Sequence, residues 1–457
     1  MIKLKILRRK ILKKVQVSVP WLEHVISDEK FAGDINIQSS QDLVLKFKNN
    51  LCLYCRGSKL LCGKSRCPAL LRLFSFMKTK NLIDAEALSG SSPPSVFIGR
   101  IGYPYVYAGP LVPPIIGNTS LFDSPEEWIG KTIDEIVDFR TKLVRGKFRV
   151  NVKKPLENQL LSRTLEIALS REPVDTEVIF KKKPSGSFLF DDEFLPMGPS
   201  APLSKIELGN VKFDHRIEKA YSDYDLGAEE AVLDLYLNGV PISAIQRAFS
   251  LGAFGIKRQR RLVPTRWSIT AVDSLISRRL IEDRVKHNPE ISEYRVYSFD
   301  YLGNKFVILL IPSKWMYEWI EAWYPRTLWN PRGDYVAIGS DWEGYRGRTT
   351  YASLGGCYYA VRLAVAEFLA REGRQASVVA MREIHPEYIM PLGVWINREC
   401  VREAFKHGCE KFDTLKDALE YISKKFAIPL KEWIKASALL RNELLQEKIT
   451  KFLRVSL

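Results

Sequence analysis

Four cysteines within sixteen residues constrain this chain more than any other feature of its sequence. They are Cys52, Cys55, Cys62 and Cys67, in the stretch LCLYCRGSKLLCGKSRCPAL. Four thiolates complete a tetrahedral shell around Zn²⁺, and a Cys-x2-Cys half presents two of them from one turn. The spacing therefore predicts a zinc finger. The Zn²⁺ would be structural, because four protein ligands leave no open coordination position.

Two alternatives to zinc stay open for the cysteine cluster. An iron–sulfur cluster also uses thiolate ligands, and cysteines that lie together by chance would bind no metal. The second half of the cluster has Cys-x4-Cys spacing, which departs from the commonest zinc-ribbon pattern. Zinc is favoured because basic residues that offset the charge of a four-thiolate site surround the cluster: Arg56, Lys59, Lys64, Arg66 and Arg72.

The positive charge of the chain is concentrated near its N-terminus. The formal net charge is +16, which favours anionic partners such as nucleic acid. Residues 1–80 hold 17 Lys and Arg against 5 Asp and Glu, so they carry 12 of the 16 surplus charges. We therefore expect this part of the chain to make the main contact with a polyanion.

No segment has the composition of a membrane-spanning helix, which needs about 20 consecutive apolar residues. The N-terminal stretch alternates basic and apolar residues, so it lacks the apolar core and the cleavage site of a secretory signal. Such a segment either lies on a membrane surface or keeps its charged side in water, and we favour the second. The uneven use of cysteine is typical of a reducing compartment. We expect a cytoplasmic protein without stable membrane association.

Composition divides the chain into four parts. Residues 1–50 are a basic segment, 51–80 hold the zinc finger and a packing helix, and 81–440 form the main body. Residues 441–457 form a C-terminal tail. The Pro-, Gly- and Ser-rich stretch 181–205 indicates either a long loop or a boundary between two lobes.

The main body interleaves helical and strand patterns without a regular βαβ rhythm. We therefore predict an α+β fold, with mixed helices and short strands around a central core. Strands at Tyr294–Tyr301 and Lys305–Ile311 should pair through a turn at Leu302-Gly303-Asn304. A further strand is predicted at Ala376–Ile384. Apolar periodicity predicts helices at Leu70–Lys80, Glu126–Val144, Pro155–Ser170, Asp225–Leu237, Pro241–Ser250, Ser268–Ile281 and Cys357–Arg371.

The tail carries a motif of the kind that binds a sliding clamp. Gln446, Ile449, Phe452 and Leu453 match the pattern Gln-x-x-aliphatic-x-x-aromatic-aromatic in all but its last place. One tight helical turn places the three apolar residues on one side as a plug, while Gln446 hydrogen-bonds separately. An ordinary amphipathic helix shows the same periodicity. We favour clamp binding because the motif lies four residues from the end of the sequence, where a tail can reach a partner.

A second basic region lies between two predicted helices. It contains five cations, one tryptophan and no acid: Lys257, Arg258, Arg260, Arg261, Arg266 and Trp267. Such cations bind phosphates and Trp stacks on bases, so this region is a candidate DNA-binding site. The preceding stretch, 237–255, resembles a helix-turn-helix without a reliable signature. A solvated charge run, or buried arginine ion pairs with Trp267 in the core, would account for the same residues equally well.

Candidate catalytic residues are few. Glu383, His385 and Glu387 alternate at the end of a predicted strand, which would place them on one face. Together with a carboxylate from elsewhere, such as Asp273, they would form a site of the kind that metal nucleases use. Ordinary surface polar residues produce such a pattern more often. The sequence does not decide whether these side chains converge.

Four segments together resemble the archaeal Nre family of DNA repair proteins. They are the cysteine cluster, VFIGRIGYPYVYAGPLVPP, RLVPTRWSITAVDSLI and QEKITKFL, and the resemblance covers essentially the whole chain. It implies a role in DNA damage repair, zinc ligands at the four clustered cysteines, and a motif at 446–453 that binds the clamp PCNA. It implies no catalytic residue that can be assigned here.

We therefore expect a protein that binds DNA and Zn²⁺ and is recruited to PCNA. The alternative is a DNA-processing enzyme that the clamp recruits, either a metal-dependent nuclease or a nucleotide-binding enzyme.

Overall fold

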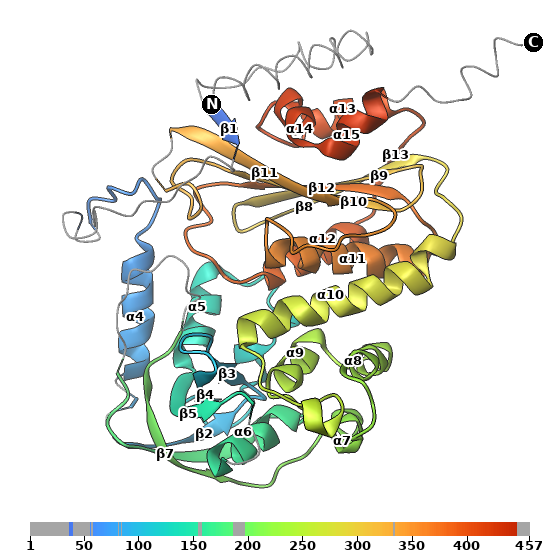
Figure 1. Cartoon of the computed structure of the whole chain (residues 1–457). Helices are drawn as coiled ribbons and strands as arrows, with labels where there is room; N and C mark the ends of the chain where they lie inside the picture. The colour runs from blue at the N-terminus through green and yellow to red at the C-terminus, as the bar shows by residue number, and fades with distance from the viewer. Residues whose placement is uncertain are drawn as a thin grey trace, which may run out of the picture.

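The computed structural model describes residues 36–39, 55, 58–80, 82–83, 85–153, 158–185, 197–331 and 334–445. Within them the chain forms twelve α-helices and two mixed sheets. Figure 1 places the larger sheet above the smaller one, with helices between and around them. The predicted α+β class is therefore confirmed for this part of the chain. The zinc finger and the tail reach beyond the described residues.

The larger sheet has seven strands in the order β1-β11-β10-β12-β9-β8-β13. The pairs β1–β11 and β10–β12 are parallel, and the other neighbouring pairs are antiparallel. The last four strands in this order are β12 (Ser377–Ile384), β9 (Asn304–Ile311), β8 (Tyr294–Tyr301) and β13 (Glu410–Phe412). The other three are β1 (Asn36–Ser39), β11 (Tyr335–Glu343) and β10 (Met316–Trp323).

Helices cover both faces of the larger sheet (Figure 1). One face packs against α11 (Gly356–Glu372) and α12 (Trp395–Lys406), and α10 (Thr265–Asp283) packs in turn against α11. The other packs against α13 (Leu415–Ser423), α14 (Leu430–Ala436) and α15 (Ala438–Leu445). Every residue of β12 is consequently buried. A strand that is covered on both sides has a continuous apolar run instead of alternation.

The β8–β9 hairpin confirms the strand pair that the sequence predicts. Its two turn residues, Leu302 and Gly303, both have positive φ, at 50° and 74°. This is the turn geometry that suits the twist of a two-residue hairpin. A Cβ on Gly303 would lie 2.8 Å from the amide nitrogen of Tyr388, so glycine also permits this close approach.

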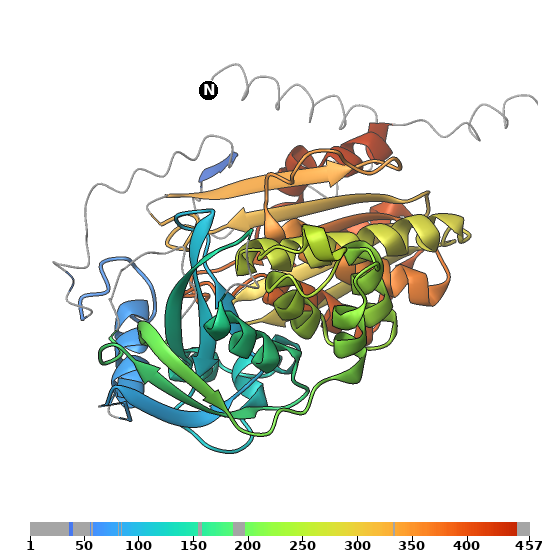
Figure 2. The same ribbon diagram turned by 60° about the horizontal axis from the view of Figure 1, so that its bottom comes forward.

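The smaller sheet has six strands in the order β2-β6-β7-β5-β4-β3. One of its faces forms a core with residues of α6 (Gln159–Leu169), which packs against it (Figure 2). The strands are β2 (Ala87–Ser92), β3 (Val96–Ile98), β4 (Tyr105–Val112), β5 (Val144–Asn151), β6 (Val174–Phe180) and β7 (Ser200–Leu208).

Two stretches that composition singles out lie at the following places in the structure. The stretch 181–205 runs from β6 into β7, and these two strands pair in one sheet. It therefore joins neighbouring strands, and the chain passes from the smaller sheet to β8 of the larger sheet only later, through the helices from α7 (His215–Ser222) to α10. The tail boundary expected at 441 falls inside α15, whose Leu444 is buried in the core.

Among the described residues, six further helices precede α10 in the chain. The predicted helix 126–144 is shorter than expected because Gly130 has φ 87° and interrupts it. The helix restarts after Thr132, which forms a capping box with Glu135. In addition to α6, these helices are α4 (Pro68–Lys80), α5 (Ile133–Lys142), α7 (His215–Ser222), α8 (Ala228–Leu237) and α9 (Ile242–Ser250).

A buried carboxylate holds the last helix on the larger sheet. Glu318 of β10 has no exposed surface. It accepts hydrogen bonds from the backbone nitrogens of Ala438 and Leu439, at 2.7 and 3.0 Å, and from the hydroxyl of Ser437. Burial raises the pKa of Glu318. This arrangement satisfies amide groups at the start of α15, which would otherwise be buried without acceptors.

A buried ion pair connects α10 to α12. Asp273 accepts two bonds from the guanidinium of Arg398, at 2.8 and 3.0 Å, and one from the amide of Gln246 on α9, at 2.9 Å. Asp273 and Arg398 are both essentially inaccessible to solvent. Arg402, one turn later, binds Glu367 of α11 at 2.7 Å. Charges therefore connect the helices that lie between the two sheets.

We expect Asp273→Ala to lower the free energy of unfolding by about 3–5 kcal/mol, because it leaves the Arg398 guanidinium buried without its main partner. The double variant Asp273→Leu/Arg398→Met removes both charges and should lose less than the single variant. Urea unfolding followed by tryptophan fluorescence measures both.

Asp283→Ala is the matched control, since it breaks the exposed Arg279–Asp283 pair of the same helix. It should cost at most about 1 kcal/mol. A loss for Asp273→Ala that is no larger than this would contradict the proposed role of the buried pair.

Candidate nucleic-acid interface

The central basic region forms the connection between α9 and α10. Of its candidate DNA-binding residues, Lys257, Arg258, Arg261, Arg266 and Trp267 are exposed. Sequence alone also allowed buried ion pairs and a core position for Trp267. The exposure of these side chains is compatible with contact to a polyanion.

Arg260 is the exception in this region. Its guanidinium donates to the backbone oxygens of Gly255, Tyr221 and Asp223 at 2.6–2.7 Å. It also lies over the rings of Tyr221 and Tyr224. Arg260 therefore fixes the connection to the end of α7, and three of its five N–H donors are already used within the protein.

The start of α10 is attached to the smaller sheet. The hydroxyl of Thr265 accepts a hydrogen bond from the backbone nitrogen of Ile98 at 2.9 Å. The backbone nitrogen of Leu262 donates to the oxygen of Val152 at 3.0 Å. Trp267 therefore lies beside the β3–β4 connection, where its ring centroid is 5.8 Å from that of Tyr103.

Two more exposed tyrosines, Tyr105 and Tyr107, follow on β4, and Arg149 of β5 lies over the Tyr105 ring at 5.5 Å. We call Trp267, Tyr103, Tyr105 and Tyr107 the aromatic row. Of these four aromatic residues, the DNA-binding site predicted from the sequence included only Trp267. The alternation in YPYVYAGP was the available signal, since alternate residues of a strand face the same side.

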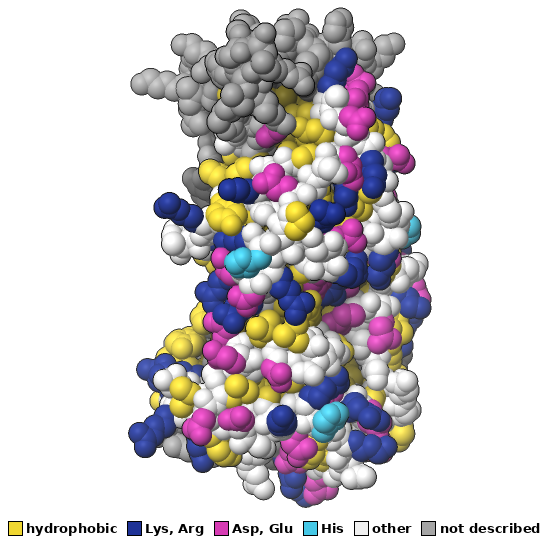
Figure 3. All heavy atoms as spheres, turned by 90° about the vertical axis from the view of Figure 1, so that its right-hand side faces the viewer, with side chains coloured by type: hydrophobic (Ala, Val, Ile, Leu, Met, Phe, Trp, Pro, Cys, Tyr) yellow, Lys and Arg dark blue, Asp and Glu magenta, His cyan; other side chains and the backbone are white. Residues whose placement is uncertain are grey.

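Neither positive nor negative charge is concentrated on the face of the molecule that Figure 3 shows. Lys and Arg side chains lie among Asp and Glu side chains across the described part of this face. If the described residues attract a polyanion strongly, the residues that do so must therefore lie on another face of the molecule.

The helix-turn-helix resemblance of 237–255 extends only to the order of the helices. α8 and α9 are joined by a short turn, but α9 buries six of its nine residues. It packs among α6, α8 and α10. A recognition helix must present an open side to a DNA groove. α9 is largely buried, so the likeness does not extend to a recognition helix.

Three of the four clustered cysteines lie within the described residues. Cys55 is buried, and Cys62 and Cys67 are partly buried. Cys67 directly precedes α4 and accepts a hydrogen bond from the backbone nitrogen of Leu71. Cys52 lies outside the described residues. The described part contains no group of three or more His, Cys, Asp and Glu side chains placed to hold a metal ion.

The cysteine segment contacts both parts of the protein. The amine of Lys64 donates to the backbone oxygen of Arg326, in the connection after β10, at 3.0 Å. Arg66 forms an ion pair with Asp134 of α5 at 2.7 Å. Two of the basic residues around the cysteines are therefore engaged within the protein.

The alternating triad after β12 does not lie on one strand face. β12 ends at Ile384, and the chain then turns, with the nitrogen of Tyr388 donating to the oxygen of His385. Glu383 is fully buried, whereas Glu387 is exposed. The expected common face is therefore absent because the strand ends one residue before His385.

Glu383 and His385 form a pair that supports the fold. The His385 ring contacts Glu383 at 3.0 Å and stacks on Tyr324 with centroids 4.4 Å apart. Glu383 also accepts hydrogen bonds from the backbone nitrogens of Ala427 and Ile428, which precede α14. Asp273 is bound to Arg398 and Gln246 instead. The structure does not bring Asp273 together with Glu383 and His385.

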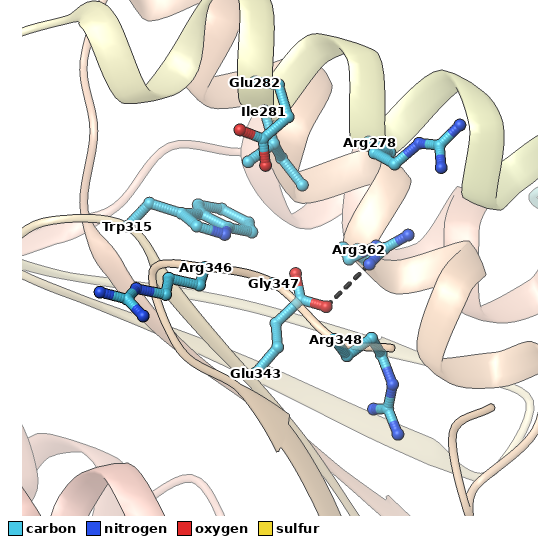
Figure 4. Close-up of a pocket in the computed structure, with 9 residues that line it drawn as sticks. All are labelled: Arg278, Ile281, Glu282, Trp315, Glu343, Arg346, Gly347, Arg348 and Arg362. Atoms are coloured by element: carbon cyan, nitrogen blue, oxygen red, sulfur yellow. Dashed lines mark hydrogen bonds and ion pairs between the residues drawn. The ribbon is translucent and has the colours of Figure 1, made fainter. Parts of the chain in front are cut away.

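A cavity of about 80 Å³ lies between α10, α11 and the connection after β11 (Figure 4). Glu343 accepts bonds there from Arg362 at 2.7 Å and from the Tyr358 hydroxyl at 3.0 Å. Figure 4 shows Arg278, Arg346 and Arg348 pointing away from the centre. A cavity that holds benzene measures about 150 Å³. This one suits a few water molecules and is too small to enclose a nucleotide.

No described helix is long and apolar enough to cross a membrane. No solved structure matches the chain. Two family models do match: archaeal Nre, N-terminal, over residues 61–330, and archaeal Nre, C-terminal, over residues 343–452.

Curated relatives agree with the family models. DNA repair protein NreB of Archaeoglobus fulgidus is 43% identical over 392 residues, which is 86% of this chain and 97% of the relative. DNA repair protein NreA of the same organism is 40% identical, over 84% of this chain and 95% of the relative. DNA repair protein NreA of Haloferax volcanii is 35% identical, over 76% of this chain and 85% of the relative. The chain therefore belongs to the archaeal Nre family.

Proposed function

We propose that this protein acts in DNA repair by binding DNA and bringing it to the sliding clamp PCNA. The observation that carries the proposal is the close similarity, over most of the chain, to relatives named DNA repair proteins. The exposed cations and Trp267 before and at the start of α10 support a DNA contact.

The N-terminal segment is proposed to supply most of the electrostatic attraction to DNA. Residues 1–14, which lie outside the described residues, contain seven Lys and Arg and no acid. Each phosphate that is neutralised releases condensed counterions, so binding should weaken steeply as the salt concentration rises.

Replacing these seven cations with Gln should weaken DNA binding at low salt and flatten its salt dependence. The intact protein, with six or more phosphate contacts, should lose about 10³-fold in affinity between 50 and 200 mM salt. Fluorescence anisotropy with labelled DNA measures both quantities.

Lys411→Gln/Lys424→Gln is the control, because both lysines are exposed on the C-terminal side of the protein. It should leave the salt dependence unchanged. If the N-terminal variant binds as the intact protein does, the electrostatic contact lies elsewhere.

A structural Zn²⁺ is proposed for Cys52, Cys55, Cys62 and Cys67. The donor set fits, since thiolates are the ligands of closed zinc sites. The described chain also reverses between the cysteines: Leu60 and Gly63 have positive φ, and the Gly63 nitrogen donates to the Leu60 oxygen at 2.7 Å. Bound Zn²⁺ would hold this turn against the connection after β10.

Elemental analysis should find one zinc per chain. Cys62→Ser should lose the metal, because three thiolates bind it less tightly than four, while helix content measured by circular dichroism stays close to that of the intact protein. Cys409→Ser, outside the cluster, should keep its zinc. Stoichiometric iron, or the absence of metal from the intact protein, would contradict the site.

Residues 446–453 are proposed to bind PCNA through Gln446, Ile449, Phe452 and Leu453. This motif lies outside the described residues and follows directly after α15. Because the buried leucines of α15 belong to the core, the binding segment is expected to begin at Gln446. Ile449 and Phe452 would enter an apolar groove, and burying each stabilises the complex by about 1.5–3 kcal/mol.

Phe452→Ala in the full-length protein should weaken clamp binding ~30-fold or more, since truncating an anchor costs at least about 2 kcal/mol. A peptide of residues 446–457 should bind the clamp with micromolar affinity, as measured by calorimetry. Lys448→Ala should have little effect, because Lys448 is not an anchor.

If Phe452 packs on the protein's own core instead, Phe452→Ala will lower the melting temperature. The peptide will then give no heat with the clamp. Either result would reject the motif.

A further inference from the structure

The outer face of the smaller sheet carries an unusual set of side chains where β3, β4 and β5 lie side by side. On β5, Val144, Phe148 and Val150 point into the core. Arg145, Lys147 and Arg149 alternate with them and so face the other way. Tyr107 of β4 is the register partner of Arg149, so rings and cations share this face.

Four aromatic rings are available to a partner along this face. Tyr105 and Tyr107 of β4 are 51% and 54% exposed, and Tyr103 and Trp267 are 49% and 48% exposed. Alternate residues of a strand lie about 7 Å apart, which leaves each tyrosine room for a separate planar ligand. The Tyr103–Trp267 contact continues the row from the sheet to the start of α10.

The cations on this face of β5, and Lys182 after β6, lack acidic partners within the described part of the chain. Arg145, Lys147, Arg149 and Lys182 form no ion pair with any residue there. Burial lowers the pKa of Lys147, and the neighbouring charges of Arg145 and Lys182 lower it further. Burial also lowers the pKa of Arg145, to about 10, together with the charge of Arg140. Like charges held close together destabilise the free protein, and an anionic ligand relieves this repulsion.

The rest of the same sheet differs in its charges. On the neighbouring strands β6 and β7, Glu177 and Glu207 are register partners, and Lys205 is paired with Glu207. Cations on that side are therefore neutralised within the protein. The excess of positive charge is local to β5, which is the neighbour of β4 and its tyrosines, and to Lys182 after β6.

We infer that the aromatic row and the cations of β5 bind single-stranded DNA, with bases stacked on Tyr105, Tyr107 and Trp267 and phosphates beside Lys147 and Arg149. The choice of DNA rests on the proposed function. Exposed rings interleaved with cations are what single strands require, since every base has a face that stacks on an aromatic side chain. A duplex keeps its bases stacked on each other and presents phosphates outward, so it would use the cations and leave the rings unused.

The test compares a labelled single strand with a duplex of the same sequence and with the matching RNA, using the full-length protein. Tyr107→Ala and Trp267→Ala should each weaken single-strand binding about fivefold or more, as expected for the loss of one stacked base. Duplex binding should change less than about twofold. Tyr107→Phe keeps the ring and should bind as the intact protein does. Arg149→Gln should reduce the slope of affinity against salt by about 1.

Tyr351→Ala is the matched control, because Tyr351 is also exposed but precedes α11 on the larger sheet. It should bind single strands normally. Three results would overturn the inference: duplex and single-strand affinities that fall equally in Tyr107→Ala, a Tyr107→Phe variant as weak as Tyr107→Ala, or tighter binding of RNA than of DNA. An intact protein that binds neither form of DNA would overturn the proposed function as well.

Discussion

The buried ion pair between Asp273 and Arg398 determines how the two halves of this protein meet. It attaches the middle of α10 to α12 on the larger sheet, while Thr265 at the start of α10 bonds to Ile98 of the smaller sheet. Breaking such a pair leaves a charge without compensation in a medium of low dielectric. The helix therefore has one favourable position. That position decides where Trp267 lies, and with it whether the rings of α10 and β4 form one row or two separate patches.

Much of the fold could be predicted because local signals and tertiary structure agree. The hairpin around Gly303 and the helices α9, α10 and α11 follow from apolar periodicity and turn residues, within a few residues of their observed ends. β10 and β11 were missed. Their stretch combines tryptophans with Glu318 and Glu321, a mixture typical of a surface, although β10 is almost wholly buried and the first half of β11 is buried as well. The pairing of β10 with the distant β12 decides their burial, and no local pattern records it.

The carboxylates show why a candidate catalytic site is harder to predict than a fold. In a sequence, Glu383 and Asp273 have the same appearance whether they hold a metal, meet water or support a helix. In the structure each has a partner in a distant segment: the backbone before α14 for Glu383 and Arg398 for Asp273. Burying a carboxylate without hydrogen bonds is costly, so its partners reveal its role. The rings of Tyr105 and Tyr107 are exposed, and sequence reasoning misses them for a different reason. Large aromatic side chains in a strand are usually assigned to the core, so a pattern of alternating tyrosines is not recognised as a surface.

Exposed rings on a rigid sheet and cations on the N-terminal segment would contribute differently to DNA binding. Attraction to phosphates acts over about 10 Å, is weakened by salt and favours any polyanion. Stacking acts only in contact and requires bases that are free of a duplex. A protein that uses both can be drawn to duplex DNA through its charges and held where the strands are separated. Damaged and replicating DNA both contain such regions, and a clamp-binding tail would keep the protein near them. The aromatic row would then distinguish among DNA structures, which the basic segment cannot do because every DNA structure presents phosphates.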